Sequence, residues 1–87
     1  MNNFKLLNIG FGKIILTNEI IAVVNPHSTL IKRLIQIAKE NDKLEDITNG
    51  RPTRSVVITK NKIYLSSIQP ETMANRLVND EFVPEEE

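Results

Sequence analysis

The stretch "NPHSTLIKRLIQIAKEND", residues 25–42, decides the fold because it carries the clearest periodic pattern in the chain. From residue 30 onward, apolar residues recur at intervals of three and four, which is typical of one face of an amphipathic helix. These residues are Leu30, Ile31, Leu34, Ile35 and Ala38, with Ile37 widening the stripe. Asn25 is the expected N-cap and Pro26 the expected first helical residue. The pattern predicts a helix that ends near residue 41.

Short β-favourable segments lie on both sides of this helix. The expected strands are residues 4–9, 13–17, 20–24, 44–47, 55–59 and 62–68. The first two flank Gly10-Phe11-Gly12, which predicts a tight turn or bulge. The run 20–24, "IIAVV", is continuously apolar and predicts a buried strand. The last two flank Lys60-Asn61-Lys62 and predict a β-hairpin in which Asn61 takes a positive φ.

These elements predict one small domain of 87 residues. Pro70 begins a second, short helix, "PETMANRLV". The expected fold class is α+β: a small, mostly antiparallel sheet packed on one main helix, with a short C-terminal helix. We assign residues 1–79 to this domain and residues 80–87 to an acidic tail that we expect to be disordered. A core of this size is usually marginal by itself, and the chain has no Cys for a disulfide, so we expect an oligomer.

Charge is distributed unevenly, although the formal net charge is zero. Residues 1–79 contain all eleven Lys and Arg against six Asp and Glu, a formal +5, whereas residues 80–87 contain five acids, a formal −5. A basic body with an acidic end indicates a polyanionic partner. The tail can be interpreted as a competitor of that partner or as a solubilising terminus.

The residues that catalysis would need are scarce. The single histidine, His27, falls in the first turn of the predicted helix and is interpreted as a surface or capping residue. Glu45 and Asp46 are adjacent in a predicted strand, so their carboxylates point to opposite faces. We therefore predict that the protein is not an enzyme and holds no metal or cofactor. No apolar run reaches the length of a membrane span or a signal peptide, and we expect a cytoplasmic protein.

The remaining candidate residues are basic. Arg51 and Arg54 lie in "TNGRPTRSVVI", residues 48–58, on either side of a proline, and Lys32 and Arg33 lie on the exposed side of the main helix. A guanidinium group suits phosphate oxygens and guanine edges because it offers several donors in one plane. Two interpretations stay open for the arginines: contacts to nucleic acid, or ordinary charges of a turn, with Arg54 equally suited to an ion pair between subunits.

Four motifs together resemble the RemA family, small bacterial regulators of extracellular-matrix and biofilm genes. They are "NIGFG" (8–12), "KR" (32–33), "GRxTR" (50–54) and "LSSIQPETMANRL" (65–77), and the resemblance extends without gaps from about residue 6 to residue 77. It implies a DNA-binding transcriptional regulator without a helix-turn-helix. It also implies a fold similar to LytTR-type DNA-binding domains, and subunits assembled into closed rings with a basic outer face that binds double-stranded DNA.

The same resemblance implies roles for individual residues. Arg51 matches the first arginine and Arg54 the last arginine of the family's Gly-Arg-Arg-Thr-Arg turn, and Arg33 matches the basic residue at the start of the helix. Pro52 stands where the family has its second turn arginine, and Glu19 stands where it has an arginine. These two departures predict DNA binding weaker than that of arginine-rich members, with a shallower dependence on salt.

Two rival functions remain at this level. The first is a structural or protein-interaction ring with weak or no DNA binding, and the second is an RNA-binding protein, because phosphate contacts do not distinguish the two polymers. The sequence leaves open the target promoters, activation as against repression, and the number of subunits.

Overall fold

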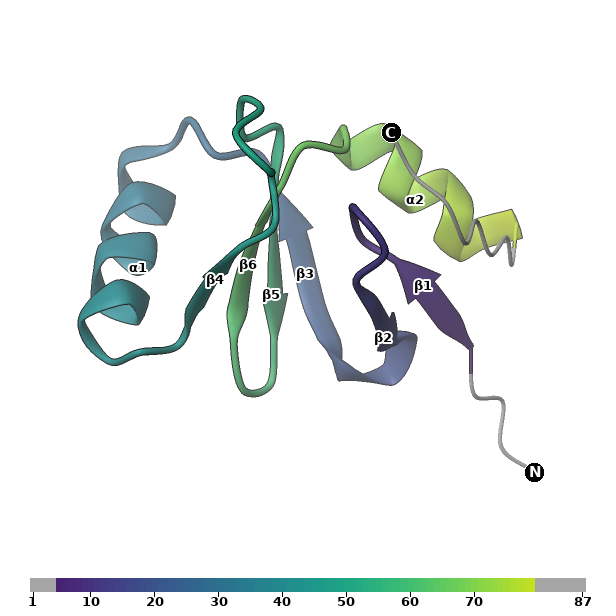
Figure 1. Cartoon of the computed structure of the whole chain (residues 1–87), viewed down its shortest axis with the longest axis horizontal. Helices are drawn as coiled ribbons and strands as arrows, with labels where there is room; N and C mark the ends of the chain where they lie inside the picture. The colour runs from purple at the N-terminus through teal and green to yellow at the C-terminus, as the bar shows by residue number, and fades with distance from the viewer. Residues whose placement is uncertain (1–4, 80–87) are drawn as a thin grey trace.

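A computed structural model describes residues 5–79, so the predicted acidic tail lies outside the described residues. The order of elements confirms an α+β fold (Figure 1). The strands are β1 (Leu6–Asn8), β2 (Ile14–Leu16), β3 (Ile20–Val24), β4 (Leu44–Asp46), β5 (Ser55–Thr59) and β6 (Ile63–Ser66). A short 3-10 helix covers Thr17–Glu19, and the α-helices are α1 (Thr29–Glu40) and α2 (Pro70–Asn79).

The centre of the fold is a four-stranded sheet in the order β3-β5-β6-β4. The predicted hairpin β5–β6 forms its middle, with Val57 opposite Tyr64. β3 pairs antiparallel with β5, and β4 pairs parallel with β6. A separate antiparallel pair, β1 and β2, lies on one side of this sheet (Figure 1). The described sheets are therefore mostly antiparallel, as predicted, with one parallel pair.

The central sheet is covered on both faces: the main helix α1 packs on one, and β1 with the short C-terminal helix α2 packs on the other. Successive residues of a strand point to opposite faces. Val56 packs in the cluster that contains Ala38 of α1, whereas the next residue, Val57, packs in the cluster formed with β1 and α2. The sequence analysis predicted both helices and did not assign the short C-terminal one to a face of the sheet.

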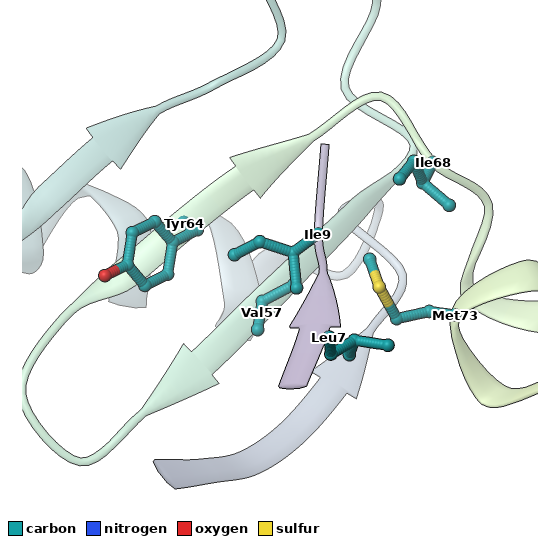
Figure 2. Packing of buried hydrophobic residues seen from close by; sticks show 6 residues of the cluster. All are labelled: Leu7, Ile9, Val57, Tyr64, Ile68 and Met73. Atoms are coloured by element: carbon teal, nitrogen blue, oxygen red, sulfur yellow. The ribbon is translucent and has the colours of Figure 1, made fainter. Parts of the chain in front are cut away.

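The face covered by β1 and α2 is closed. Its buried side chains, which Figure 2 shows, are Leu7, Ile9, Val57, Tyr64, Ile68 and Met73. They come from both ends of the chain as well as from the hairpin. A buried arginine, Arg76 of α2, also crosses to this region and donates from Nη1 to the Asn8 carbonyl at 2.8 Å. This arginine ties the C-terminal helix to the first strand.

The face covered by α1 is less complete. Ala38 is buried, whereas the other side chains that α1 packs on the sheet are partly buried; they are Ile31, Leu34 and Ile35. Leu30 is 74% exposed and Ile37 is 47% exposed. At 100° per residue, Leu30 lies about 90° from the centre of the packed arc. It therefore belongs to the edge of the apolar stripe and not to its buried centre, contrary to the prediction.

The start of α1 also differs from the prediction. Ser28 is the N-cap, and its Oγ accepts from the backbone N–H groups two and three positions later at 3.1 and 3.3 Å. Asn25 Oδ1 instead accepts from the His27 N–H at 2.9 Å. Pro26 and His27 consequently lie before the helix. Asn25 and Ser28 are both good capping residues, and Ser28, which lies closer to the first apolar residue of the helix, is the one that caps it.

Two strand-level predictions were wrong in detail. β3 is an edge strand and is only partly buried, with Ile21 65% exposed. An apolar run does not distinguish a central strand from an edge strand that another surface can cover. Asn61 has no positive φ, because the non-glycine residues with positive φ are Phe11, Asp42 and Asn49 within the described chain. The hairpin turn is closed by the Thr59 N–H and hydroxyl, which both donate to the Lys62 carbonyl, at 2.9 and 2.7 Å.

Candidate functional site

The loop between β4 and β5 contains the predicted turn, and it projects at the top of the molecule in Figure 1. Asn49 and Gly50 have φ of 56° and 85°, and the Arg51 N–H donates to the Thr48 carbonyl at 3.1 Å. Two successive positive φ values closed by such a bond are typical of a type I′ turn, which favours Asn-Gly. Gly50 thus supplies the second positive φ that this turn needs.

Both ends of this loop are attached to the sheet. Before the turn, Asp46 Oδ1 accepts from the backbone N–H and the hydroxyl of the buried Thr48 at 2.9 and 2.6 Å. After the turn, the Arg54 N–H donates to the Ser66 carbonyl at 2.8 Å, which extends the β5–β6 pairing by one residue. The turn is therefore a fixed support, and its arginines start from well-defined backbone positions.

The two arginines line one polar hollow of about 310 Å³. The other lining residues are Pro52, Ser67 and Gln69. Both arginine side chains are exposed, and neither forms an ion pair within residues 5–79. Ser67 Oγ is buried beside the hollow and has no hydrogen-bond partner in the described chain. Two guanidinium groups with free N–H edges can hold a phosphate group.

The other two predicted site residues lie elsewhere. Lys32 and Arg33 are exposed on α1, within its first half, and neither lines the hollow between Arg51 and Arg54. The structure therefore brings together two of the four candidate residues. The two on the helix form a separate basic position.

Sequence reasoning missed three residues around the arginines. Phe11 lies beneath Arg51, with the guanidinium Cζ 4.8 Å from the centre of the ring. Ser67 and Gln69 line the hollow from the segment after β6. The signals were present, because Phe11 is the centre of "GFG" and the other two belong to "SSIQ". No pattern in the sequence pairs these motifs with the arginine turn, since the first lies far before it in the chain and the second lies beyond a whole hairpin.

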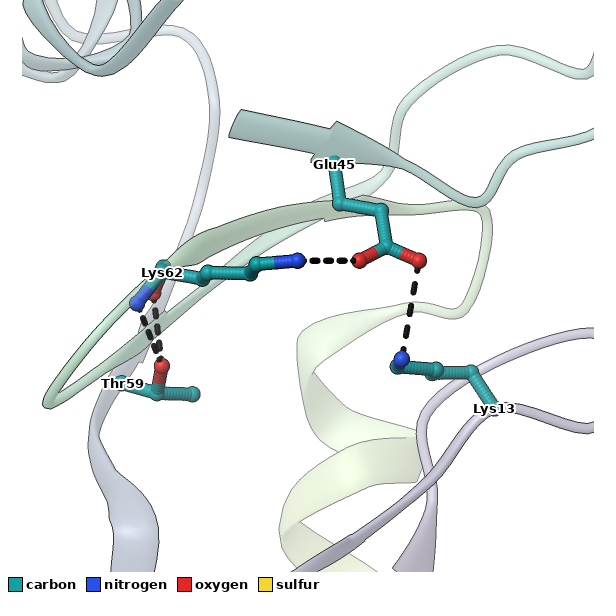
Figure 3. Close-up of polar contacts among 4 residues, drawn as sticks. All are labelled: Lys13, Glu45, Thr59 and Lys62. Atoms are coloured by element: carbon teal, nitrogen blue, oxygen red, sulfur yellow. Dashed lines mark hydrogen bonds and ion pairs between the residues drawn. The ribbon is translucent and has the colours of Figure 1, made fainter. Parts of the chain in front are cut away.

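A second group of charges lies on the closed side of the sheet and is internally paired. Glu45 Oε1 is 3.1 Å from Lys62 Nζ, and its Oε2 is 3.6 Å from Lys13 Nζ (Figure 3). The hydrogen bond from Lys62 is the main cause that lowers the pKa of Glu45, and the same bond raises the pKa of Lys62. These lysines are already partnered, in contrast to the arginines at the turn.

The structure also shows where the two residues lie that depart from the expected arginine pattern, Pro52 and Glu19. Pro52 is exposed and lines the hollow between the arginines, so it occupies the surface at which a further charge would have pointed. Glu19 ends the 3-10 helix before β3, and its backbone carbonyl accepts from the Lys60 N–H at 3.1 Å. Neither residue interrupts the sheet.

Other surfaces offer less chemistry. A hollow of about 490 Å³ separates the C-terminal half of α1 from the hairpin tip, with side chains such as Leu34, Ile37 and Ile58. Across residues 5–79, no three His, Cys, Asp or Glu side chains gather closely enough to hold a metal ion. No helix in the described part of the chain is long and apolar enough to cross a membrane.

Comparison with known proteins gives a consistent match over nearly the whole chain. A family model described as "Extracellular matrix regulatory protein A-like" matches residues 6–77. Relatives named "Putative regulatory protein" include one from Oceanobacillus iheyensis, 45% identical over 97% of this chain and 99% of the relative. One from Desulforamulus reducens is 52% identical over 91% and 89% of the two chains. One from Fervidobacterium nodosum is 55% identical over 86% and 82%.

Proposed function

The chain belongs to the RemA-like family of regulatory proteins, and from this premise we propose that it is a cytoplasmic, DNA-binding transcriptional regulator that works as a ring. The observation that carries the proposal is the pair Arg51 and Arg54, which line one hollow on a turn anchored to the sheet. In this proposal their guanidinium groups hold phosphates of double-stranded DNA. Phosphate contacts position a protein on the duplex and supply much of its affinity.

The state of the charges supports this role. Arg51 and Arg54 form no ion pair within residues 5–79, so no carboxylate of the described chain competes for their guanidinium groups. The unequal charge of the sequence points the same way, since residues 1–79 carry a formal +5. Lys32 and Arg33 provide a second basic position on α1 that a longer DNA segment would reach in the same complex.

Exposed apolar residues support self-association. Ile21 and Ile14 lie on the side of β3 and β2, whereas Leu30 and Ile37 lie on α1 at the other side of the sheet, and all four side chains are exposed. A ring needs two different patches that fit one another on neighbouring subunits. Two separate apolar positions support such an arrangement. Many weak phosphate contacts in one ring would then add through avidity.

The test compares charge-removing variants in DNA binding. Arg51→Ala and Arg54→Ala should weaken binding to double-stranded DNA, and the slope of log K against log salt should fall by about 0.9 for each phosphate that the variant no longer binds. Lys39→Ala is the matched control, because it removes one exposed positive charge from the last turn of α1. Binding is measured by fluorescence anisotropy at several salt concentrations, and oligomer size by light scattering.

The outcomes separate the proposal from its rivals. Loss of DNA binding at Arg51→Ala with unchanged oligomer size supports the regulator. Equal effects of Arg51→Ala and Lys39→Ala would contradict a specific role of the turn. An intact oligomer that ignores DNA at all salt concentrations would favour a protein-interaction ring. Stronger binding to structured RNA than to DNA in direct competition would favour the RNA-binding alternative.

A further inference from the structure

Phe11 has an unusual backbone conformation for an aromatic residue. Its φ is 47°, and the glycines on either side have φ of 138° and 80°. A side chain with a Cβ is disfavoured at positive φ, and residues that adopt it routinely are Gly, Asn and Asp. The Phe11 ring is also only partly buried, so core packing does not account for an aromatic residue here. The conformation is held by its surroundings, and the ring points towards Arg51.

Buried hydrogen bonds hold the glycine turn on its inner side. Asn8 Oδ1 accepts from the Gly10 N–H at 2.8 Å, and Ser66 Oγ donates to the Ile9 carbonyl at 2.6 Å. The Lys13 N–H closes the turn by donating to the Gly10 carbonyl at 2.9 Å. Gly10 has a φ of 138°, at which a residue with a Cβ is strained, and a Cβ there would also lie only 3.3 Å from Ser66 Oγ, so this position favours glycine.

The same network extends to the C-terminal helix. Arg76 donates to the Asn8 carbonyl, and Ser66 Oγ also accepts from the Ile68 N–H at 3.1 Å. The glycine turn is therefore fixed by β6 and by α2, from the other end of the sequence. Phe11 is the residue that this fixed turn presents on its outer side.

The contact with Arg51 has the geometry of a cation–π interaction. The 4.8 Å between the guanidinium Cζ and the ring centre is inside the distance at which such contacts are favourable. A guanidinium group that lies over a ring uses its face for this contact, and the N–H groups at its edge stay available for hydrogen bonds. A long side chain held in this way loses less rotamer freedom when it binds a ligand.

We propose that Phe11 is the positioning residue of Arg51: its ring holds the guanidinium group in the orientation that meets a DNA phosphate. This inference rests on the proposed function and assigns a role to the "GFG" turn within it. The competing explanation is that Phe11 only fills the space beside Asp46, Ile47 and Asn49, a hollow that it also lines. A space-filling role requires apolar volume, whereas positioning requires an aromatic face.

The experiment therefore replaces the Phe11 ring either with an apolar side chain of similar size or with another aromatic ring. Phe11→Leu should lower DNA affinity about two- to tenfold for each Arg51 contact, the range expected when a long side chain that is no longer held must lose its rotamer freedom on binding. Phe11→Tyr and Phe11→Trp keep the ring face and should bind within about twofold of the parent chain or more tightly. Affinity is measured by anisotropy at one fixed low salt concentration, with melting temperature and oligomer size measured in parallel.

A double-mutant cycle tests whether the effect passes through Arg51. In an Arg51→Ala background, Phe11→Leu should cause no further loss of affinity, because the group that it positions is gone. Equal loss in both backgrounds would overturn the proposal, as would Tyr and Trp variants that bind as weakly as the Leu variant. If Phe11→Leu fails to fold, the affinities of the Phe, Tyr and Trp proteins, each compared with its Arg51→Ala partner, still decide the question.

The two proposals fail in different ways. If Arg51→Ala weakens DNA binding and Phe11→Leu does not, the DNA contact stands and the positioning role is overturned. If Arg51→Ala leaves DNA binding unchanged, the proposed contact and the positioning role both fall.

Discussion

The two faces of the central sheet differ in how completely the chain covers them. On the face of β1 and α2, Ile9 and Met73 are fully buried, and the buried Arg76 links the first strand to the last helix. On the face of α1, partly buried side chains surround a small buried centre, and Leu30 and Ile37 are exposed. The first core is closed within the described chain, whereas the second leaves apolar side chains such as Leu30 and Ile37 exposed.

This difference also relates to the location of the candidate site. The glycine turn follows Ile9, which is buried on the closed face, and the ring of Phe11 in this turn lies beneath Arg51. The open face holds Lys32 and Arg33 on an exposed side of α1. We infer that the closed face supplies the rigidity that the arginine turn needs.

The largest expected effect on stability comes from truncating side chains that pack on the two faces of the central sheet. Met73→Ala should lower the free energy of unfolding by about 2–5 kcal/mol, because it leaves a cavity in a closed cluster. Ile35→Ala should lower it by about 1–2 kcal/mol, because the removed atoms are already partly exposed. Denaturant unfolding at low protein concentration measures both. Equal losses would contradict the distinction between a closed and an open face.

Protein concentration sharpens the same comparison. If α1 is covered by another subunit in the oligomer, the loss caused by Ile35→Ala should grow as concentration rises, because association is linked to folding. The loss caused by Met73→Ala should change little. A concentration-independent pair of values would place the subunit contact away from α1.

A smaller effect is expected at the buried arginine. Arg76→Met keeps an unbranched apolar stem, although a shorter one, and removes the guanidinium donor to the Asn8 carbonyl. Loss of a hydrogen bond from a charged donor is expected to lower the free energy of unfolding by about 1.5–3 kcal/mol. Arg76→Lys, which keeps a charge and a donor, should lose less of the free energy of unfolding than Arg76→Met. Unfolding of both variants gives the comparison, and a Met variant as stable as the parent would show that the bond contributes nothing net.

The smallest effect is expected at the rim of the closed face, where Glu45 meets Lys62 and Lys13. The hydrogen bond from Lys62 lowers the pKa of Glu45 below its ordinary value of 4.5, so the unfolded chain takes up this proton more readily than the folded chain. The ion pair therefore stabilises the fold fully above pH 4.5 and loses its contribution as the pH falls through the lowered pKa.

Glu45→Gln checks that effect directly. The variant should melt slightly below the parent at neutral pH, and the two melting temperatures should converge in acid. Glu40→Gln is a suitable control, because Glu40 is exposed on α1 and, within residues 5–79, its carboxylate accepts only from Gln36. A constant difference between the Glu45 variant and the parent across this pH range would contradict the assignment.

Much of the fold was predictable because it depends on local patterns. The helix ending near residue 41, the hairpin of residues 55–59 and 63–66, and the helix beginning at Pro70 follow from periodicity, turn residues and proline. The errors were of another kind. Leu30 was assigned to the buried face and the strand 20–24 to the interior, because a hydrophobic pattern records apolarity and says nothing of what covers it.

The candidate site divides in the same way. Arg51 and Arg54 are separated by two residues, so their common location could be inferred from one turn. Phe11 is forty positions before Arg51, and only the packing of β1 against the sheet brings it beneath the guanidinium group. Arg76 could not be recognised as buried, since a charged residue in a short helix usually faces solvent.

By itself, the sequence determined the protein's elements, its family and its two turn arginines. The tertiary structure alone decided which sheet face is closed, how Asn8, Ser66 and Arg76 lock the glycine turn, and which ring lies under Arg51. The reason is physical. Helix and strand preferences arise from contacts between residues a few positions apart, whereas burial and cation–π contacts depend on segments that only the folded topology brings together.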